Sequence, residues 1–171
     1  MNKYLIVVDV QKDFVDGALG TYEAQAIIPR VKEKIAEYRA NGRKVIFTRD
    51  THQKNYLETN EGKHLPVEHC IEGTDGWQVY EGLADGDSVI IDKPTFGYLD
   101  WRKCIEDSAD LEIELVGLCT DICVVSNALI IKAMFPDATV SVDSTACAGV
   151  TPLSHEAALN TMKMCQVEVL G

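Results

Sequence analysis

The chain has 171 residues, of which 46% are hydrophobic and 25% charged, a composition typical of one globular domain spanning residues 1–171. The formal net charge is −11 at pH 7 without any run of basic residues, which argues against nucleic-acid and anionic-membrane partners. No apolar stretch reaches the roughly 18 residues of a membrane span. The first residues also lack a signal-peptide cleavage site, so we expect a cytoplasmic protein.

Apolar runs of strand length alternate with helical patterns along the chain. Six runs rich in Val, Ile and Leu are typical of buried parallel strands, and they cover residues 4–10, 44–48, 88–92, 111–117, 139–142 and 166–170. Four segments have helical patterns, at residues 22–41, 98–107, 121–135 and 151–164. This alternation predicts right-handed crossovers. We therefore expect an α/β fold, a doubly wound three-layer α/β/α sandwich with a six-stranded, mainly parallel sheet.

One segment interrupts this alternation. Residues 50–86 contain three of the four histidines and Trp77, together with a turn-forming stretch at residues 72–76. Loops longer than roughly 15 residues are usually functional or disordered. The aromatic residues and histidines argue against disorder, so the segment is expected to be functional.

A candidate nucleophile follows the fourth expected strand. The apolar run breaks at Gly117 and continues as a helix with Cys123 in its first turn. Thr120 is a candidate N-cap, and the helix N-terminus is expected to acidify the thiol and to offer N–H groups to an oxyanion. A core-filling cysteine is the alternative, since buried cysteines are common. Cys119, in the turn itself, is expected to serve packing.

Two polar residues end other expected strands. Asp9 follows a run of five apolar residues, and Lys93 follows residues 88–92. Sites form at the carboxyl ends of parallel strands. Taken alone, Asp9 could cap a loop and Lys93 could be a surface residue. Together with Cys123 they are candidates for one catalytic site, because an ammonium group lowers a thiol pKa and a carboxylate can accept the proton of the thiol.

The cysteines do not form a disulfide pattern. No Cys-x-x-Cys pair occurs, and a chain of this size does not need disulfide bonds for stability. We expect reduced, mostly core-filling thiols at all six positions: Cys70, Cys104, Cys119, Cys123, Cys147 and Cys165.

Several short motifs in the same order resemble the isochorismatase-like cysteine hydrolases, and among them the nicotinamidase/pyrazinamidase type. The resemblance covers nearly the whole chain and rests on residues 8–14, 50–52, 66–74, 92–93 and 117–124. It implies a catalytic triad of Asp9, Lys93 and Cys123. It also implies a cis peptide between Leu118 and Cys119, and an oxyanion hole made by the backbone N–H groups of Cys119 and Cys123.

The resemblance also implies a metal site in residues 50–86. Asp50, His52 and His69 match the metal ligands of such nicotinamidases, and Glu61 aligns with a fourth ligand found in some of them. The expected cofactor is a divalent metal, with zinc favoured and manganese or iron as alternatives. From spacing alone, Asp-x-His in a solvated loop is a weak signal. The other two histidines match no motif, and we expect a surface residue at His64 and a helix-start residue at His155.

The activity implied by the resemblance is release of ammonia from a small carboxamide through a Cys123 thioester, with nicotinamide as the first substrate. Phe14 and Trp77 are candidates for the wall that stacks on the ring, with Phe96 and Tyr98 behind them, although each has an equally plausible place in the core. The partners implied are the small-molecule amide and further copies of the chain in a homo-oligomer.

One departure leaves the substrate open. Nicotinamidases commonly have a tryptophan ahead of their Pro-x-His motif, whereas residues 64–69 here contain no aromatic residue other than histidine and one extra residue between Pro66 and His69. Another small amide or a carbamoyl compound is therefore an alternative substrate. The cysteine argues against isochorismatase proper, which cleaves a vinyl ether without that nucleophile.

Two other classes of function compete with the amidase. The domain could be a non-catalytic α/β binding module, in which Cys123 would be unreactive. It could also be a thiol redox protein, which would require a reversible disulfide between Cys119 and Cys123.

Overall fold

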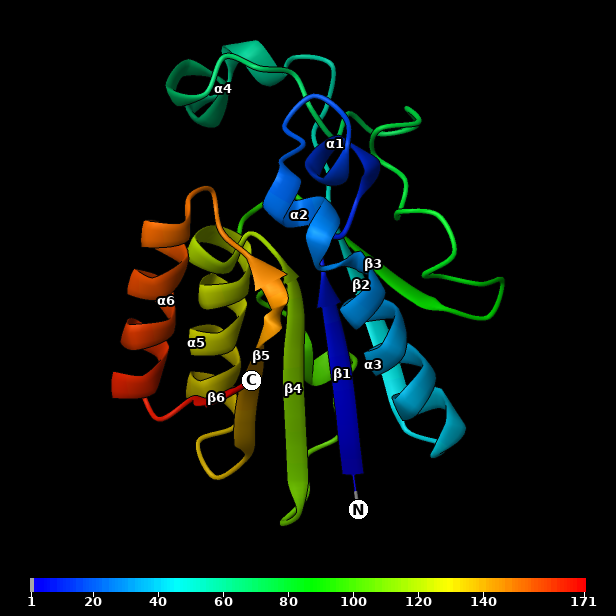
Figure 1. The fold of residues 1–171 in the computed structure, drawn as a ribbon, viewed down its shortest axis with the longest axis vertical. Helices are drawn as coiled ribbons and strands as arrows, with labels where there is room; N and C mark the ends of the chain where they lie inside the picture. Colours follow the sequence, from blue (N-terminus) through cyan, green and yellow to red (C-terminus); the bar gives the residue numbers. More distant parts are fainter. Residues whose placement is uncertain (1) are drawn as a thin grey trace.

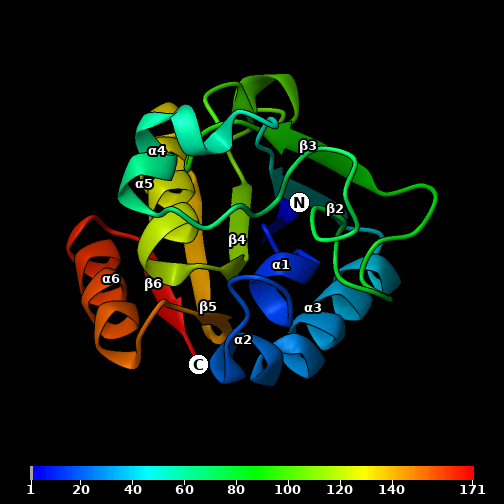
Figure 2. The ribbon, with the colours of Figure 1, turned by 90° about the horizontal axis from the view of Figure 1, so that it is seen from above.

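The computed structural model describes residues 2–171 and has a central sheet covered by helices on both faces (Figures 1 and 2). The sheet has six strands in the order β3-β2-β1-β4-β5-β6, and every neighbouring pair is parallel. The strands are β1 (Asn2–Val8), β2 (Lys44–Asp50), β3 (Val89–Lys93), β4 (Leu111–Leu118), β5 (Thr139–Ala148) and β6 (Glu168–Leu170). The predicted six-stranded sheet is confirmed, and it is parallel throughout.

The helices range from single turns to 13 residues. They are α1 (Lys12–Val15), α2 (Tyr22–Ala26), α3 (Ile28–Ala40), α4 (Asn60–His64), α5 (Val125–Met134) and α6 (Pro152–Met164). Three shorter turns accompany them: the 3-10 turns η1 (Tyr56–Glu58) and η2 (Trp101–Lys103), and the π-helical turn η3 (Thr120–Val124). None of the helices within residues 2–171 is long and apolar enough to cross a bilayer.

The side chains of the apolar strands pack into two hydrophobic cores, one on each face of the sheet. Along β1, Tyr4, Ile6 and Val8 face the helices α5 and α6, whereas Leu5 and Val7 face α2 and α3. This alternation follows from the two-residue repeat of a strand, and burial on both faces explains why the strands appear as continuous apolar runs. Figure 2 shows the resulting three layers, with α5 and α6 on one face and α3 on the other.

Several expected boundaries are wrong. The helix predicted at 22–41 is two helices that meet at Ile27, because Pro29 in the first turn of α3 favours a new helix start. The helix predicted at 98–107 is only the η2 turn, which places the fully buried Trp101 in the core. Packing therefore outweighs helix propensity there.

Strand β5 runs six residues beyond the predicted end at position 142. The apolar pattern stops at the buried Asp143, whose Oδ2 lies 3.0 Å from an Arg30 nitrogen and 3.2 Å from Lys34 Nζ. A buried carboxylate is tolerated when such partners neutralise it. Since those partners lie on α3, more than a hundred residues away in sequence, the local pattern could not reveal the continuation.

Gly117 lets strands β1 and β4 approach closely where the site begins. Its φ is +120°, and a Cβ there would overlap the carbonyl oxygen of Val8, its partner in β1. Gly117→Ala is therefore expected to lower the free energy of unfolding by about 2–3 kcal/mol, from strain and overlap together. Urea unfolding measures the change. Gly86→Ala is the matched control, because nothing lies within 4 Å of a Cβ at position 86, and equal stability of the two variants would contradict the prediction.

Candidate active site

The carboxyl edge of the sheet brings three predicted residues into contact. Asp9 directly follows β1, Lys93 is the last residue of β3, and Cys123 lies in η3 just after β4. Lys93 Nζ lies 2.6 Å from Asp9 Oδ2 and 3.5 Å from Cys123 Sγ. Asp9 and Lys93 have no exposed surface, and Cys123 is 4% exposed. We call these three residues the thiol cluster.

Hydrogen bonds fix the two charged members of the thiol cluster. The Thr48 hydroxyl donates to Asp9 Oδ1 at 2.6 Å, and Asp9 N donates to the Thr48 carbonyl at 3.2 Å. Asp9 itself has a left-handed backbone, with φ +47°. Lys93 Nζ also donates to the Thr95 carbonyl at 3.0 Å. Each charged group thus has several partners, as a buried ion pair requires.

Burial dominates the protonation of the thiol cluster. Burial raises the pKa of Cys123 well above that of an ordinary thiol; the charge of Asp9 adds to this, and that of Lys93 opposes it. The acidic thiol predicted from the helix field is therefore wrong. Burial also raises the pKa of Asp9, against the opposing charge of Lys93. Burial alone would lower the pKa of Lys93, but Asp9 and Cys123 outweigh it and raise that pKa, so the amine is charged.

The turn before Cys123 differs in one respect from the prediction. The peptide between Leu118 and Cys119 is cis, as the resemblance implied. Thr120, however, does not cap the helix: Cys119 occupies the N-cap, and the Thr120 hydroxyl instead lies 2.8 Å from His155 Nδ1. The π-helical turn begins at Thr120, so this residue lies inside the helix rather than before it. His155 lies in the first turn of α6 as expected, and its contact with Thr120 was not foreseen.

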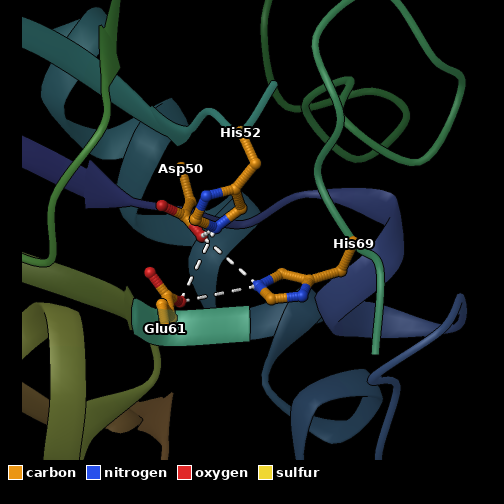
Figure 3. Close-up of side chains that lie close together, drawn as sticks. All are labelled: Asp50, His52, Glu61 and His69. Carbon is orange, nitrogen blue, oxygen red and sulfur yellow. Dashed lines mark hydrogen bonds and ion pairs between the residues drawn. The ribbon is translucent and has the colours of Figure 1, made fainter. Parts of the chain in front are cut away.

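A second cluster lies beside the thiol cluster. Asp50 at the end of β2, His52, Glu61 on α4 and His69 point their polar atoms toward a common centre (Figure 3). One potential ligand atom from each residue lies within 4.8 Å of the others. Asp50 Oδ2 is 2.9 Å from His52 Nε2 and 3.6 Å from His69 Nε2. We call this group the cation cluster; Glu61 is its only half-buried member, the others being buried.

The chemistry of the cation cluster fits a divalent metal. Asp50 Oδ1 is buried and accepts no hydrogen bond from any described residue. His69 Nδ1 lies 2.8 Å from the Val67 carbonyl, so Nδ1 carries the proton and Nε2 keeps its lone pair for a ligand. Burial would raise the pKa of Asp50, but the hydrogen bond from His52 and the positive charge of Lys93 outweigh it and lower that pKa, which keeps a carboxylate. Two imidazoles and two carboxylates are ligands that zinc, manganese and iron accept.

A cavity of about 320 Å³ connects the two clusters. Cys123 lines it together with Asp50, Glu61 and His69. Most of the remaining wall is apolar, and it includes Phe14, Leu19, Leu65, Phe96, Ile122 and Val150. A small molecule in this cavity would touch the thiol at one point and the cation cluster at another.

Two of the four predicted wall aromatics do not line this cavity. Phe14 and Phe96 do. Trp77 instead donates its indole N–H to the Thr51 hydroxyl at 2.8 Å and packs against the Arg49 guanidinium. Tyr98 packs edge-on against Trp101, with ring centroids 5.1 Å apart. The predictions for Trp77 and Tyr98 are therefore wrong, because each ring is already engaged by neighbours.

The sequence did not reveal some of the residues that line the cavity. Leu65 and Val150 are 39% and 56% exposed, yet both line the cavity. Leu65 lies in the stretch where nicotinamidases commonly have a tryptophan, and that departure was the one signal in the sequence. Val150 precedes α6 and carries no motif. His64, expected at the surface, is exposed, with Nδ1 lying 2.8 Å from the Asn60 carbonyl.

Comparison with known proteins agrees with this arrangement. The sequence profile of the isochorismatase domain matches residues 3–171. The chain belongs to the isochorismatase family. This isochorismatase-family hydrolase is 31% identical over 147 residues to an uncharacterized isochorismatase family protein, PncA, of Bacillus subtilis (strain 168), which covers 75% of this chain and 78% of the relative.

Solved structures of related hydrolases superpose over the whole chain. The pyrazinamidase of Pyrococcus horikoshii, solved in complex with zinc, matches with a TM-score of 0.84 and 28% identity, and 99% of each chain is covered. The nicotinamidase/pyrazinamidase PncA of Bacillus subtilis matches with a TM-score of 0.84 and 26% identity, and 100% of each chain is covered. The predicted resemblance of this isochorismatase-family hydrolase to the nicotinamidase/pyrazinamidase type is thus confirmed.

Proposed function

We propose that this protein is a cysteine-dependent amidohydrolase that converts nicotinamide to nicotinate and ammonia. The observation that carries the proposal is the position of Cys123 Sγ, 3.5 Å from a buried ammonium group and in the wall of a mostly apolar cavity. The relatives named as nicotinamidases and pyrazinamidases support the substrate class. A buried thiol beside paired charges is suited to nucleophilic catalysis.

In the first half of the reaction, Asp9 accepts the thiol proton of Cys123 while Lys93 stabilises the thiolate. The raised pKa of Asp9 suits this role, because a stronger base takes a proton from a weak acid more readily. The sulfur attacks the carboxamide carbon, and the oxyanion accepts hydrogen bonds from the N–H groups of Cys119 and Cys123. Asp9 then donates the proton to the departing nitrogen, which leaves as ammonia.

In the second half, water replaces the leaving group. Asp9, now ionised again, takes a proton from a water molecule, and the resulting hydroxide attacks the thioester carbon. The carbon–sulfur bond breaks, and the proton held by Asp9 returns to Cys123. The product is the carboxylic acid, and the thiol is restored for the next cycle.

The cation cluster is proposed to hold a divalent metal through Asp50, His52 and His69, with Glu61 as a fourth ligand. Zinc is favoured, because the related pyrazinamidase was solved with zinc, and manganese or iron are alternatives. When bound, such an ion supplies a Lewis acid for the pyridine nitrogen or for a water molecule beside the ring. Phe14 and Phe96 contribute apolar walls that hold the ring and exclude water.

A second candidate substrate is a small amide or carbamoyl compound without an aromatic ring. The observation that favours it is the aliphatic wall contributed by Leu65 and Val150. An aliphatic side chain offers burial to a ligand but no stacking on a pyridine ring. The reaction at Cys123 would be the same.

The test is ammonia release from a panel of nicotinamide, pyrazinamide, aliphatic amides and carbamoyl compounds, with nicotinate as the blank. Nicotinamide is expected to give the highest kcat/KM. Turnover of aliphatic or carbamoyl compounds alone would select the second candidate. Release from none of them, together with a thiol inert to iodoacetamide, would contradict the amidase and favour a non-catalytic binding module.

Removal of the metal is expected to reduce hydrolysis strongly. The buried Asp50 Oδ1 has no partner among the described residues, and hydrogen bonds such as that of His69 Nδ1 orient ligands for an ion. Metal content is measured after gentle purification, and activity is measured after chelation and after zinc is restored. Absence of any divalent ion, combined with indifference to the chelator, would contradict the site.

The acidic limb of the pH profile is expected to lie above the ordinary carboxyl value of 3.8, because burial raises the pKa of Asp9. Asp9 must be ionised to accept the thiol proton, so kcat/KM falls as the pH falls through that raised pKa. Thr48→Val sharpens the test. The Thr48 hydrogen bond lowers the pKa of Asp9, so its loss should move the limb to higher pH, and a limb that stays in place would count against Asp9 as the base.

A further inference from the structure

The segment that carries Asp9 also holds the backbone beside the cation cluster. Gln11, two residues after Asp9, has no exposed surface. Its Nε2 donates to the Asp50 carbonyl at 2.9 Å and to the Trp77 carbonyl at 2.8 Å, while its Oε1 accepts from Asp50 N at 2.7 Å. Both backbone groups of Asp50 are therefore fixed by a single side chain.

Asp13 makes the corresponding contact at the other end of the cluster. Its Oδ2 accepts the N–H of Cys70 at 2.8 Å, and Cys70 directly follows His69. Cys70 is fully buried and has a left-handed backbone, with φ +47°, a conformation that a non-glycine residue keeps only when its surroundings fix it. Asp13 N also donates to the Gly76 carbonyl at 2.9 Å.

These contacts matter because three of the four potential ligands lie outside the sheet. His52, Glu61 and His69 belong to the stretch between β2 and β3, where the described residues form short helices and isolated bridges only. Ligand atoms must keep their positions closely to bind a metal well, and neighbouring hydrogen bonds provide that order. Side chains next to β1 that hydrogen-bond to this stretch can hold it in a fixed position relative to the sheet.

We propose that Gln11 and Asp13 are positioning residues that hold Asp50 and His69 in place for a divalent cation. The inference rests on the cation site of the proposed function and adds to it the residues that build that site. Neither side chain belongs to the four potential ligands. The same few residues after β1 thus set the geometry of the thiol cluster and of the cation cluster.

Gly76 offers an independent way to disturb Asp13. A Cβ at position 76 would overlap the carboxylate of Asp13, and the backbone of Gly76 does not itself require glycine, since its φ is not in the left-handed region. Alanine there should displace the Asp13 side chain, which is the more flexible of the two. Gly76→Ala is therefore expected to reproduce the effect of Asp13→Ala on the metal without touching a ligand.

The experiment measures metal binding rather than turnover. Zinc affinity is obtained by competition with a chromophoric chelator, and ligand geometry from the absorption spectrum of the cobalt-substituted protein. Asp13→Ala and Gly76→Ala are expected to weaken zinc binding by about 10- to 100-fold and to change the cobalt spectrum. Asp13→Asn keeps an acceptor for Cys70 and should stay close to the wild type. Tyr38→Phe, which removes the buried 2.7 Å hydrogen bond from Tyr38 on α3 to Glu114, is the matched control and should leave both readouts unchanged.

The outcomes separate this inference from the proposed function. If Asp13→Ala and Gly76→Ala bind zinc as tightly as the wild type, with the same cobalt spectrum, the positioning role is overturned while the cation site stands. Should Asp13→Ala fail to fold, Gln11→Leu serves as the second variant with the same expected loss. A wild-type protein that binds neither ion would overturn both the positioning role and the cation site, and the amide panel would still test the thiol cluster.

Discussion

Replacing Cys123 by alanine is expected to abolish ammonia release, with a loss of about 10⁴-fold or more in kcat. The sulfur is the only protein atom proposed to bond to the substrate carbon, so neither half of the reaction can proceed when it is removed. Cys119 also lines the cavity, but the Lys93 ammonium contacts the sulfur of Cys123 and not that of Cys119. The coupled assay for ammonia measures the loss.

Cys147→Ala is the matched control for that variant. Cys147 and Cys123 are both 4% exposed and belong to the same apolar core, so each substitution leaves a comparable void. Cys147→Ala should keep the wild-type rate. Acid quenching during turnover should trap an acylated protein in the wild type and not in Cys123→Ala, as mass spectrometry detects. Turnover retained by Cys123→Ala would contradict a thioester mechanism.

Lys93→Met is expected to remove activity and to lower the free energy of unfolding by about 3–5 kcal/mol, because it leaves a buried charge without its partner. Lys93 Nζ lies 2.6 Å from Asp9 Oδ2, and neither residue has exposed surface. Without the ammonium, the pKa of Asp9 rises further, since Lys93 lowers it in the wild type. The stability loss should therefore be largest at high pH and shrink as the pH falls and Asp9 takes up a proton. Urea unfolding at several pH values measures it.

The double variant Asp9→Asn/Lys93→Met separates the effect of the unpaired Asp9 carboxylate from the effect of the lost packing of the lysine chain. It removes both buried charges, so it should recover much of the stability that Lys93→Met loses. It should remain inactive, because neither the base nor the ammonium is present. A double variant as unstable as Lys93→Met would show that packing of the lysine chain, rather than the unpaired carboxylate, causes the loss.

The sheet and the thiol cluster could be predicted because both follow from one local pattern. A strand buried on both faces is a continuous apolar run, and a polar residue at its carboxyl end stands out. Asp9, Lys93 and Cys123 each have that position, and a parallel sheet brings such ends to one edge. The pattern alone could thus place together three residues that are separated by long stretches of the chain.

The cation cluster was accessible only through family resemblance. Asp50 and His52 are two residues apart, but Glu61 and His69 lie in a stretch without sheet pairing. The path of such a stretch depends on distant side chains, here Gln11, and not on its own periodicity. The prediction for Trp77 failed for a similar reason, because its indole is bound to Thr51 in a contact that spacing does not reveal.

The protonation of Cys123 could not be predicted from its place in the sequence. The field of a helix start favours a thiolate, and burial favours a thiol. The 4% exposure of Cys123 decides the balance in favour of the thiol. Burial is a property of the packed protein, set by both strands and helices around the residue.

The short stretch after β1 can function only with its present number of residues. Asp9, Gln11 and Asp13 are spaced two residues apart, and each contacts a different part of the site: Lys93, Asp50 and Cys70. A single insertion or deletion among them would turn at least one side chain away from its partner. Substitutions here can be graded in effect, whereas any change in the number of residues should disable both clusters together. The length of this stretch, more than any one side chain in it, limits how the active site can vary.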